Sequence, residues 1–183
     1  MDQGLVDRAR HGDREAFGAL AAASVDRLFA IATLMLRDRV AAEDAVQEAL
    51  IRAWRDLPAL RDPARFEAWL RRLLVRAAYD EARRGRHRRT ELSLLPDIHP
   101  AVDDGTDLVA TREVLNRAFR RLTVEHRAAI VLRHYLGLSV PELADNLAVP
   151  LGTAKSRLHH AEQALRAAVE ADARGSAAGG GGR

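Results

Sequence analysis

The chain has 183 residues, 48% of them hydrophobic, which is enough for one mid-sized or two small globular domains. It contains no cysteine, so disulfide bonds and thiolate metal sites are excluded. No run approaches the roughly 18 apolar residues of a membrane span, and the N-terminus lacks the apolar core of a signal peptide. We therefore expect a cytoplasmic protein without membrane insertion.

Charge is segregated along the chain, although basic residues (29) exceed acidic residues (26) only slightly. Residues 61–90 carry 10 basic and 4 acidic side chains, residues 91–111 carry 0 and 5, and residues 112–183 carry 11 and 7. Two basic blocks around an acidic one indicate two surfaces that face a polyanion and a connector that avoids it. Chance variation among solvated helix faces is the alternative for the first block.

Helical periodicity runs through most of the chain, so we predict an all-α fold of two small helical domains. Pro58 and Pro63 interrupt the first helical block. Two prolines, a glycine and acidic residues between positions 93 and 108 predict a flexible linker, and the glycine-rich end predicts a disordered tail. The expected boundaries are 1–89 for the first domain, 90–111 for the acidic linker, 112–170 for the second domain and 171–183 for the tail.

The segment AAEDAVQEALIRAWRDL, residues 41–57, predicts a two-faced helix. One face is apolar. The other carries two carboxylates, one amide and one exposed aliphatic residue, which are Asp44, Glu48, Gln47 and Ile51. An isoleucine among acidic and amide side chains is a plausible docking site for a basic partner with one apolar contact. A solvated helix with one stray apolar residue is the alternative if this helix is taken alone.

The segment ELADNLAVPLGTAKSRL, residues 142–158, predicts a helix-turn-helix. Ser139 and Glu142 form a capping-box pattern that starts a helix at Val140, and residues 148–150 end it in a turn. A second helix near Leu151 has an apolar stripe at Ala154, Leu158, Ala161 and Leu165. Its far side carries Lys155, Ser156, His159 and His160, while Thr153 at its start suits a phosphate.

Two other interpretations of this segment remain open. It could be a helical hairpin whose exposed face carries one lysine and two histidines without reading DNA. The paired histidines also suggest a metal site, but adjacent residues on a helix point about 100° apart and no third ligand lies one turn away. We therefore expect no metal.

Several motifs in order resemble the extracytoplasmic-function (ECF) sigma factors of bacteria, the small two-domain members of the primary-sigma family. They are GDREAF at residues 12–17, AEDAVQEALIRAW, FEAWLRRLLVRAAYDEARR, and LRHYLGLSVPELADNLAVPLGTAKSRLHHAEQALR. The resemblance covers residues 12–166. Each motif alone is weak, and their combination is specific.

The resemblance implies a transcription initiation factor without a cofactor or catalytic residues. Its implied partners are core RNA polymerase (the β′ clamp helices and the β flap), promoter DNA and an anti-sigma factor. The first domain would dock on the clamp helices through Asp44, Gln47, Glu48 and Ile51, and the loop from Asp56 to Phe66 would capture a flipped base. The implied minus-ten contacts are Arg65, Trp69, Arg72, Arg76, Arg83, Arg84 and Arg86. The implied minus-thirty-five contacts are Arg133, Thr153, Lys155, Ser156, His159 and His160.

This sequence departs from the family pattern at two places. The family usually has asparagine where Arg76 stands, at a position linked to minus-ten recognition. The recognition helix has His160-Ala161-Glu162 where arginines usually flank the alanine. Both departures leave the preferred promoter sequence open.

Two other classes of protein were weighed. A stand-alone helix-turn-helix regulator would need a ligand pocket or a phospho-acceptor domain in residues 1–90, and neither pattern is visible there. An enzyme would need a glycine-rich phosphate loop, a nucleophile paired with a base, or metal-ligand spacing, and the sequence has none of these.

Overall fold

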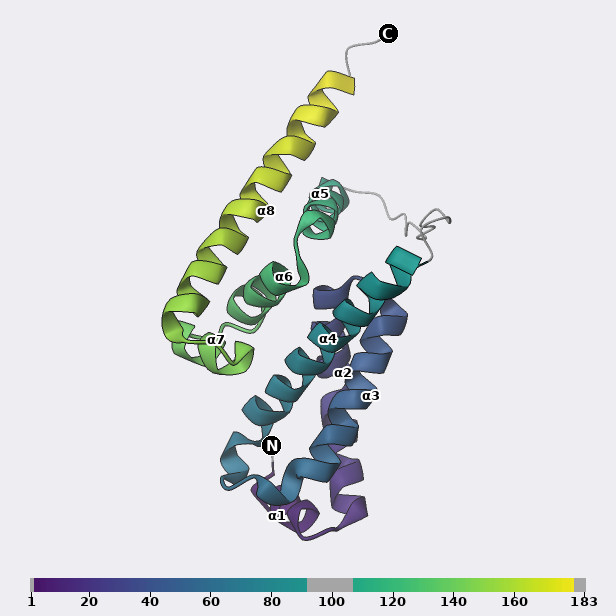
Figure 1. Cartoon of the computed structure of the whole chain (residues 1–183), viewed down its shortest axis with the longest axis vertical. Coiled ribbons are helices and arrows are strands. Elements are labelled where there is room, and N and C mark those ends of the chain that lie inside the picture. Colours follow the sequence, from purple (N-terminus) through teal and green to yellow (C-terminus); the bar gives the residue numbers. More distant parts are fainter. Residues whose placement is uncertain (1, 92–106, 180–183) are drawn as a thin grey trace.

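The computed structural model describes residues 2–91 and 107–179, and every regular element within these ranges is helical (Figure 1). The helices are α1 (Gln3–Arg10), α2 (Arg14–Leu36), α3 (Arg39–Asp56), the 3-10 turns η1 (Leu57–Ala59) and η2 (Pro63–Arg65), α4 (Phe66–Glu91), α5 (Asp107–Arg121), α6 (Val124–Ile130), the π-helical segment η3 (Val131–Tyr135), α7 (Val140–Leu147) and α8 (Leu151–Gly179). The all-α prediction is confirmed.

Aspartate caps start the first three helices of the N-terminal domain. Asp2, Asp13 and Asp38 each accept a hydrogen bond from a backbone N–H in the first turn, at 2.8, 3.0 and 3.1 Å. Each carboxylate satisfies a donor that has no partner within the helix and opposes the positive end of the helix dipole. These caps fix where α1, α2 and α3 begin, and therefore which faces the helices turn inward.

The loop between α3 and α4 is short and anchored. Pro58 and Pro63 lie in η1 and η2, as expected from their inability to continue a helix. Leu57, Leu60 and Phe66 are buried in the core and hold both ends of the loop. The segment between these anchors therefore has a defined shape despite its exposed tip.

The C-terminal domain contains the predicted helix-turn-helix. The Ser139 side chain accepts from the Glu142 backbone N–H, and the Glu142 carboxylate accepts from the Ser139 backbone N–H at 2.8 Å, which completes the capping box. Ala148 adopts a left-handed conformation (φ 53°) that ends α7, and α8 begins at Leu151. The predicted starts of both helices are confirmed. Ala154, Leu158 and Ala161 are buried, so the predicted inward stripe of α8 is also confirmed.

The helices that flank the expected linker and tail extend further than the sequence suggests. α4 continues to Glu91 and α5 starts at Asp107, while residues 92–106 of the expected linker lie outside the described residues. α8 continues to Gly179, well beyond residue 171, where we expected a disordered tail to begin. At its residue Asp172, α8 is anchored to α5, because the buried carboxylate pairs with Arg117 (2.9 Å) and Arg121 (2.7 Å).

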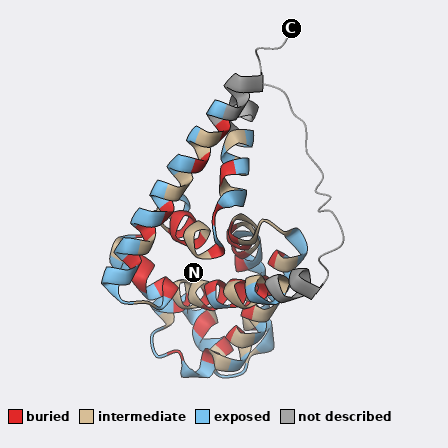
Figure 2. Cartoon of the chain, turned by 45° about the horizontal axis from the view of Figure 1, so that its top comes forward, coloured by how far each residue is buried: buried red, intermediate tan, exposed pale blue. Residues whose placement is uncertain are grey.

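Helix α2 has 23 residues and a mean hydropathy of 1.7 in its most apolar window, so it is the single helix of the described ranges that could cross a membrane by length and composition. This differs from our expectation that no run approaches that limit, because Asp26 and Arg27 interrupt the run without lowering its mean enough. The high hydropathy of α2 is explained by its place in the core and not by a membrane. α2 buries Leu20, Leu28 and Ile31 and contacts α1, α3 and α4, as a core helix does. Buried residues lie on the inward sides of the helices and exposed residues on their outward sides (Figure 2).

The two domains pack against each other, which the sequence did not predict. α4 contacts α7, and α2 contacts α6, so that the buried side chains of both domains form one continuous core. Arg127 of α6 donates from Nε to the Met35 carbonyl at the end of α2. The same guanidinium donates to the carbonyls of Phe119 (3.3 Å) and Leu122 (2.7 Å), so one side chain joins α2 to the α5–α6 turn.

Candidate functional site

The four predicted docking residues line one hollow on the N-terminal domain, which we call the docking hollow. It has a volume of about 260 Å³, and its lining consists of Asp44, Gln47, Glu48, Ile51, Glu81 and Arg84. Ile51 is 55% exposed, an unusual position for an isoleucine in a well-packed domain. The hollow thus offers carboxylates, one amide and one accessible aliphatic side chain.

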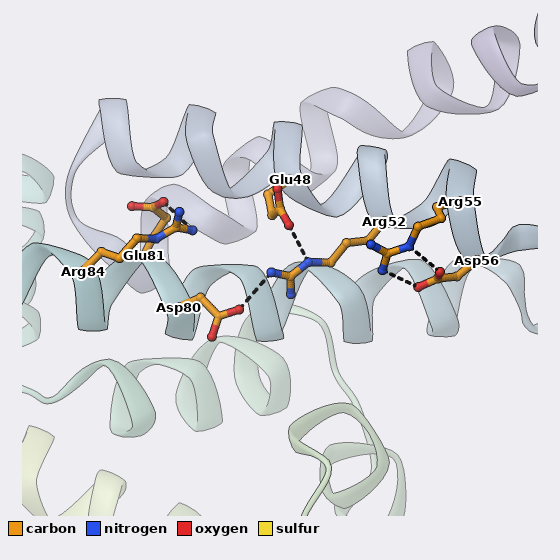
Figure 3. Close-up of polar contacts among 7 residues, drawn as sticks. All are labelled: Glu48, Arg52, Arg55, Asp56, Asp80, Glu81 and Arg84. Atoms are coloured by element: carbon orange, nitrogen blue, oxygen red, sulfur yellow. Dashed lines mark hydrogen bonds and ion pairs between the residues drawn. The ribbon is translucent and has the colours of Figure 1, made fainter.

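An ion-pair network holds the carboxylates of this region in place (Figure 3). The Arg52 guanidinium donates to Glu48 at 2.7 Å and to Asp80 at 3.0 Å, which joins α3 to α4. The hydrogen bond to Glu48 and then the one to Asp80 raise the pKa of Arg52 above its ordinary value, against the opposing effect of burial. Glu48 therefore enters the hollow with its orientation fixed by a partner on its own helix.

Arg84 lies in the docking hollow, although the sequence analysis assigned it to minus-ten DNA. It pairs with Glu81 at 2.8 Å, and the Glu81 side chain is only 5% exposed. A helix turns about 100° per residue, so Arg84 is about 120° around α4 from Arg72. Arg84 lines the docking hollow, whereas the predicted minus-ten residues Trp69 and Arg72 line a different hollow.

Trp69, Arg72, Arg76 and Arg83 recur at i, i+3, i+7 and i+14 on α4 and share one face, which we call the arginine stripe. Arg76 and Arg83 are exposed, and Arg72 is half-buried. The Arg72 Nε atom is buried without a hydrogen-bond partner among the described residues. Trp69 is half-buried and packs on Phe66 with ring centroids 6.0 Å apart. The side chain of Arg86 lies outside the described residues.

Arg65 stands just before this stripe. It is exposed in η2 and pairs with Asp62 at 3.4 Å. Together with Leu60, Trp69 and Arg72 it lines a cleft of about 410 Å³. Three of the predicted minus-ten residues, Arg65, Trp69 and Arg72, thus line one cleft, whereas Arg76 and Arg83 follow further along the same face of α4.

Tyr79 lies on the same side of α4 as Arg72 and Arg76, and its hydroxyl oxygen is buried. Burial raises the pKa of Tyr79 to about 12, with opposing contributions from the charges of Arg157, which lowers it, and Glu125, which raises it. The phenol is therefore neutral at physiological pH. Both charged residues belong to the C-terminal domain, so this part of α4 faces that domain.

Helix α8 presents outward the residues that are predicted to contact the minus-thirty-five element. Thr153, Lys155, Ser156, His159 and His160 are all exposed, and the two histidine rings are 5.8 Å apart. The Ser156 hydroxyl donates to the Thr153 carbonyl at 3.1 Å, which leaves its oxygen able to accept. The ammonium group of Lys155, the hydroxyl groups of Thr153 and Ser156 and the two imidazole rings are therefore all accessible on the outward face of α8.

Arg133 has a structural partner that the sequence did not suggest. It is half-buried in η3 and donates to the Leu138 carbonyl at 2.7 Å, in the turn before α7. A hydrogen bond from a charged donor to a backbone carbonyl stabilises the turn. Its role as a DNA contact remains a prediction.

Sequence reasoning missed several residues that shape these surfaces. Asp80 and Glu81 pair with arginines of the docking region, and Asn146 accepts a hydrogen bond from Arg71 at 3.2 Å across the domain boundary. The partners in two of these pairs are far apart in sequence, so helical periodicity gave no signal. Within the described residues, no group of three or more His, Asp or Glu side chains could hold a metal ion.

Two family models match this chain. Sigma-70 region 2 matches residues 20–89, and Sigma-70 region 4 matches residues 112–165. The first match spans α2, α3, α4 and the loop between them. The second spans the helix-turn-helix, so the two matched regions coincide with the two helical domains.

Curated relatives agree with the family models. The chain is 38% identical over 154 residues to the ECF RNA polymerase sigma factor SigM of Mycobacterium tuberculosis, with 84% of this chain and 77% of the relative covered. It is 32% identical to the RNA polymerase sigma-E factor of Streptomyces avermitilis, with 87% and 88% covered. Sigma factors are transcription initiation factors and not enzymes.

Solved structures of sigma factors share this fold. CnrH in complex with the cytosolic domain of CnrY has a TM-score of 0.64 and 28% identity, covering 93% of this chain and 98% of that one. RpoE in complex with the anti-sigma factor NepR from Bartonella quintana has a TM-score of 0.63 and 28% identity, covering 85% and 98%. The chain therefore belongs to the ECF sigma factors of the sigma-70 family, which direct RNA polymerase to promoters.

Proposed function

We propose that the docking hollow binds core RNA polymerase, that the arginine stripe and the loop before α4 bind the minus-ten element, and that α8 reads the minus-thirty-five element. One observation carries this proposal: all four residues predicted to dock on the polymerase line a single hollow. The chain acts through binding and not through catalysis, in the cytoplasm where the polymerase is.

The chemistry of the docking hollow suits a basic helical partner. Asp44 and Glu48 attract cations, Gln47 donates and accepts hydrogen bonds, and Ile51 offers apolar area. In this proposal that partner is the pair of β′ clamp helices of RNA polymerase, which the resemblance to sigma factors supports. Because Arg52 already holds Glu48, little side-chain entropy is lost when the partner arrives.

The arginine stripe suits a single-stranded backbone next to an aromatic platform. Arg72, Arg76 and Arg83 can donate to phosphates, and Trp69 can stack or pack beside a base. Unstacking a base costs a few kcal/mol, which a shaped cleft beside Trp69 can offset. Arg76, where the family has asparagine, adds a charge rather than an amide, so this chain has a stronger phosphate contact at that point.

The outward face of α8 suits the major groove. Lys155 can donate to guanine O6 and N7, and a neutral histidine can donate or accept at a base edge. Thr153 lies in the first turn of α8, where backbone donors favour a phosphate. A second site of contact, with the β flap, belongs to the same domain in this proposal.

An anti-sigma factor is a further proposed partner. RpoE of Bartonella quintana was solved in complex with the anti-sigma factor NepR, and CnrH was solved in complex with the cytosolic domain of CnrY. We infer that this chain is held inactive by a protein that covers the docking hollow, because an inhibitor at that surface prevents polymerase binding directly.

Reconstituted transcription tests the proposal. The purified chain is mixed with purified core polymerase, and association is measured together with transcription from a pool of genomic fragments. We expect a stable complex and transcripts from a small subset of fragments that core polymerase alone does not produce.

Two results would contradict this assignment. Tight, salt-insensitive binding to a duplex without polymerase would favour the stand-alone regulator, since phosphate-dominated binding falls steeply with salt. Failure to associate with core polymerase, by a chain of normal helical content, would remove the assignment of the hollow.

A further inference from the structure

Helix α8 carries a carboxylate on the side that is proposed to read the minus-thirty-five element. Lys155, His159 and Glu162 recur at i, i+4 and i+7, so their side chains lie on one side of the helix. All three residues are exposed. A carboxylate on this side is repelled by the phosphates of DNA, so a favourable contact of Glu162 with DNA requires a hydrogen-bond donor on a base.

His134 of η3 fixes the direction of this carboxylate. Its Nε2 atom lies 2.9 Å from Glu162 Oε1, and the imidazole is the donor because an ionised carboxylate only accepts. The side chains of His134 and Glu162 are 56% and 44% exposed, and ion pairs at such exposure contribute little to folding stability. Among the described residues, Glu162 Oε2 has no hydrogen-bond partner. The pair therefore orients a carboxylate whose second oxygen is able to accept another hydrogen bond.

The four bases differ in what they offer to a carboxylate in the major groove. Guanine presents the acceptors N7 and O6, and thymine presents the acceptor O4 and a methyl group, so neither donates to a carboxylate. Adenine has an amino donor next to the acceptor N7, whereas cytosine presents its N4 amino group without an adjacent acceptor. Cytosine is therefore the base whose major-groove edge fits a carboxylate best.

We propose that Glu162 determines specificity in the upstream promoter element: its second carboxylate oxygen accepts a hydrogen bond from the N4 amino group of a cytosine, and His134 is the positioning residue that holds the carboxylate. This inference rests on the DNA-reading role of α8 proposed above. Glu162 lies about 10.5 Å beyond Lys155 along the helix axis, at 1.5 Å per residue. Successive bases are about 3.4 Å apart, so for a helix lying along the groove the cytosine is about three base pairs from the base that Lys155 contacts.

The carboxylate affects affinity and specificity in opposite directions. It favours one base, but its negative charge repels the phosphates on both sides of the groove. Removal of the charge should therefore relax the base preference and leave the average affinity for DNA equal or higher. Loss of a residue that only supports the fold of α8 would instead weaken binding to all sequences alike.

Transcription by the full chain in complex with core polymerase tests this inference, on promoters randomised in the upstream element. Glu162→Ala should reduce the preference for cytosine at one position by about fivefold, without lowering total transcription from the pool. Glu170→Ala is the matched control, because it removes the same charge from another exposed glutamate of α8, about two turns further along the helix. The control should keep the base preference of the wild type.

Two substitutions of His134 test its positioning role on the same promoter pool. His134→Ala removes the donor to Glu162 and should reduce the same cytosine preference, by less than Glu162→Ala does because the carboxylate remains. His134→Gln keeps an N–H donor and should restore most of the preference. An equal loss of preference in both His134 variants, or no loss in either, would overturn the positioning role.

An unchanged base preference in Glu162→Ala, or an equal loss of transcription from all promoters, would overturn the inference about Glu162. Lys155→Ala, measured on the same pool, separates that result from a failure of the proposed function. If Lys155→Ala relaxes the preference at its own position and Glu162→Ala relaxes none, only the inference fails. If neither substitution changes the preference, the inference fails together with the proposed reading of bases by α8.

Discussion

The docking hollow and the outward face of α8 present charge in opposite ways. In the hollow region, Glu48 is held by Arg52 and Glu81 by Arg84, so these two carboxylates are fixed by arginine partners. On α8, Lys155, His159 and His160 are exposed and form no ion pair among the described residues. A fixed surface loses little entropy on binding and suits a partner of constant shape, whereas free side chains can adjust to different base edges. The difference matches one invariant polymerase and a set of varied promoters.

The largest expected effect comes from reversing the charge of the fixed surface. Asp44→Arg together with Glu48→Arg should weaken association with core polymerase by about a hundredfold or more, because like charges brought face to face cost several kcal/mol. The measurement is affinity for core polymerase, with helical content followed by circular dichroism. Glu170→Arg is the matched control. Unchanged affinity in the double variant would show that the polymerase binds elsewhere.

Substitutions on the outward face of α8 should change promoter specificity and should not change affinity for core polymerase. Lys155→Ala and His160→Ala should each relax the upstream-element preference at a separate position, by about 1–3 kcal/mol where the contact to a base is direct. The measurement is transcription from promoters randomised in the upstream element. The same base preference in both variants as in the wild type would mean that this face does not read sequence.

A more moderate effect should follow when the fixed surface is loosened without reversing its charge. Arg52→Met keeps much of the side-chain volume but removes the bonds to Glu48 and Asp80. Core affinity should fall about two- to twelvefold, because Glu48 must then be ordered on binding at a cost of about 0.5–1.5 kcal/mol. Titration of the variant against core polymerase gives the answer. Tighter binding would show that the lost positive charge matters more than the lost orientation.

The smallest effect is expected in the helix that supports the recognition face. Ser139→Ala removes the cap of α7 and should lower the free energy of unfolding by about 1 kcal/mol. Hydrogen bonds from the Ser139 side chain and backbone lower the pKa of Glu142 below its ordinary value. A lowered folded-state pKa gives stability that is present above the unfolded pKa and is lost as pH falls through the folded value.

Thermal unfolding at several pH values checks this coupling. The difference in melting temperature between wild type and Ser139→Ala should be largest near neutral pH. It should shrink as the pH falls below the ordinary glutamate pKa of about 4.3 and through the lowered pKa of Glu142 in the folded state. A difference independent of pH would show that the carboxylate contributes nothing to the cap.

Local patterns in the sequence predicted the parts of the molecule that depend on local physics. Ser139, Glu142 and Leu151 identified where α7 and α8 begin, and the spacing of Asp44 and Ile51 identified one face of α3 that the structure gathers into a hollow. These signals work because a cap or a stripe lies within a few turns of one helix.

The features that the sequence did not reveal depend on contacts between distant residues. Arg84 looks like its neighbour Arg83, and only the position of α3 places it in the docking hollow. Arg127 and Asn146 have no pattern that distinguishes them, yet they join the domains across separations of 92 and 75 residues. The proposed roles of individual DNA-contacting residues remain predictions.

The Asp172 carboxylate prevents α8 from sliding along α5, because it is paired with both Arg117 and Arg121. Arg117 and Arg121 lie one turn apart, and Asp172 is bonded to both while its side chain is only 5% exposed. A slide of α8 along α5 by one turn, about 5.4 Å, would break both bonds and leave a buried charge unpaired. Both the position of α8 along α5 and its rotation about its own axis are therefore fixed. We expect Asp172→Asn to disturb DNA recognition by α8 although residue 172 lies far from the exposed residues at the start of the helix. Without the two ion pairs, α8 can rotate relative to α5, and the direction in which Lys155 and His160 point changes.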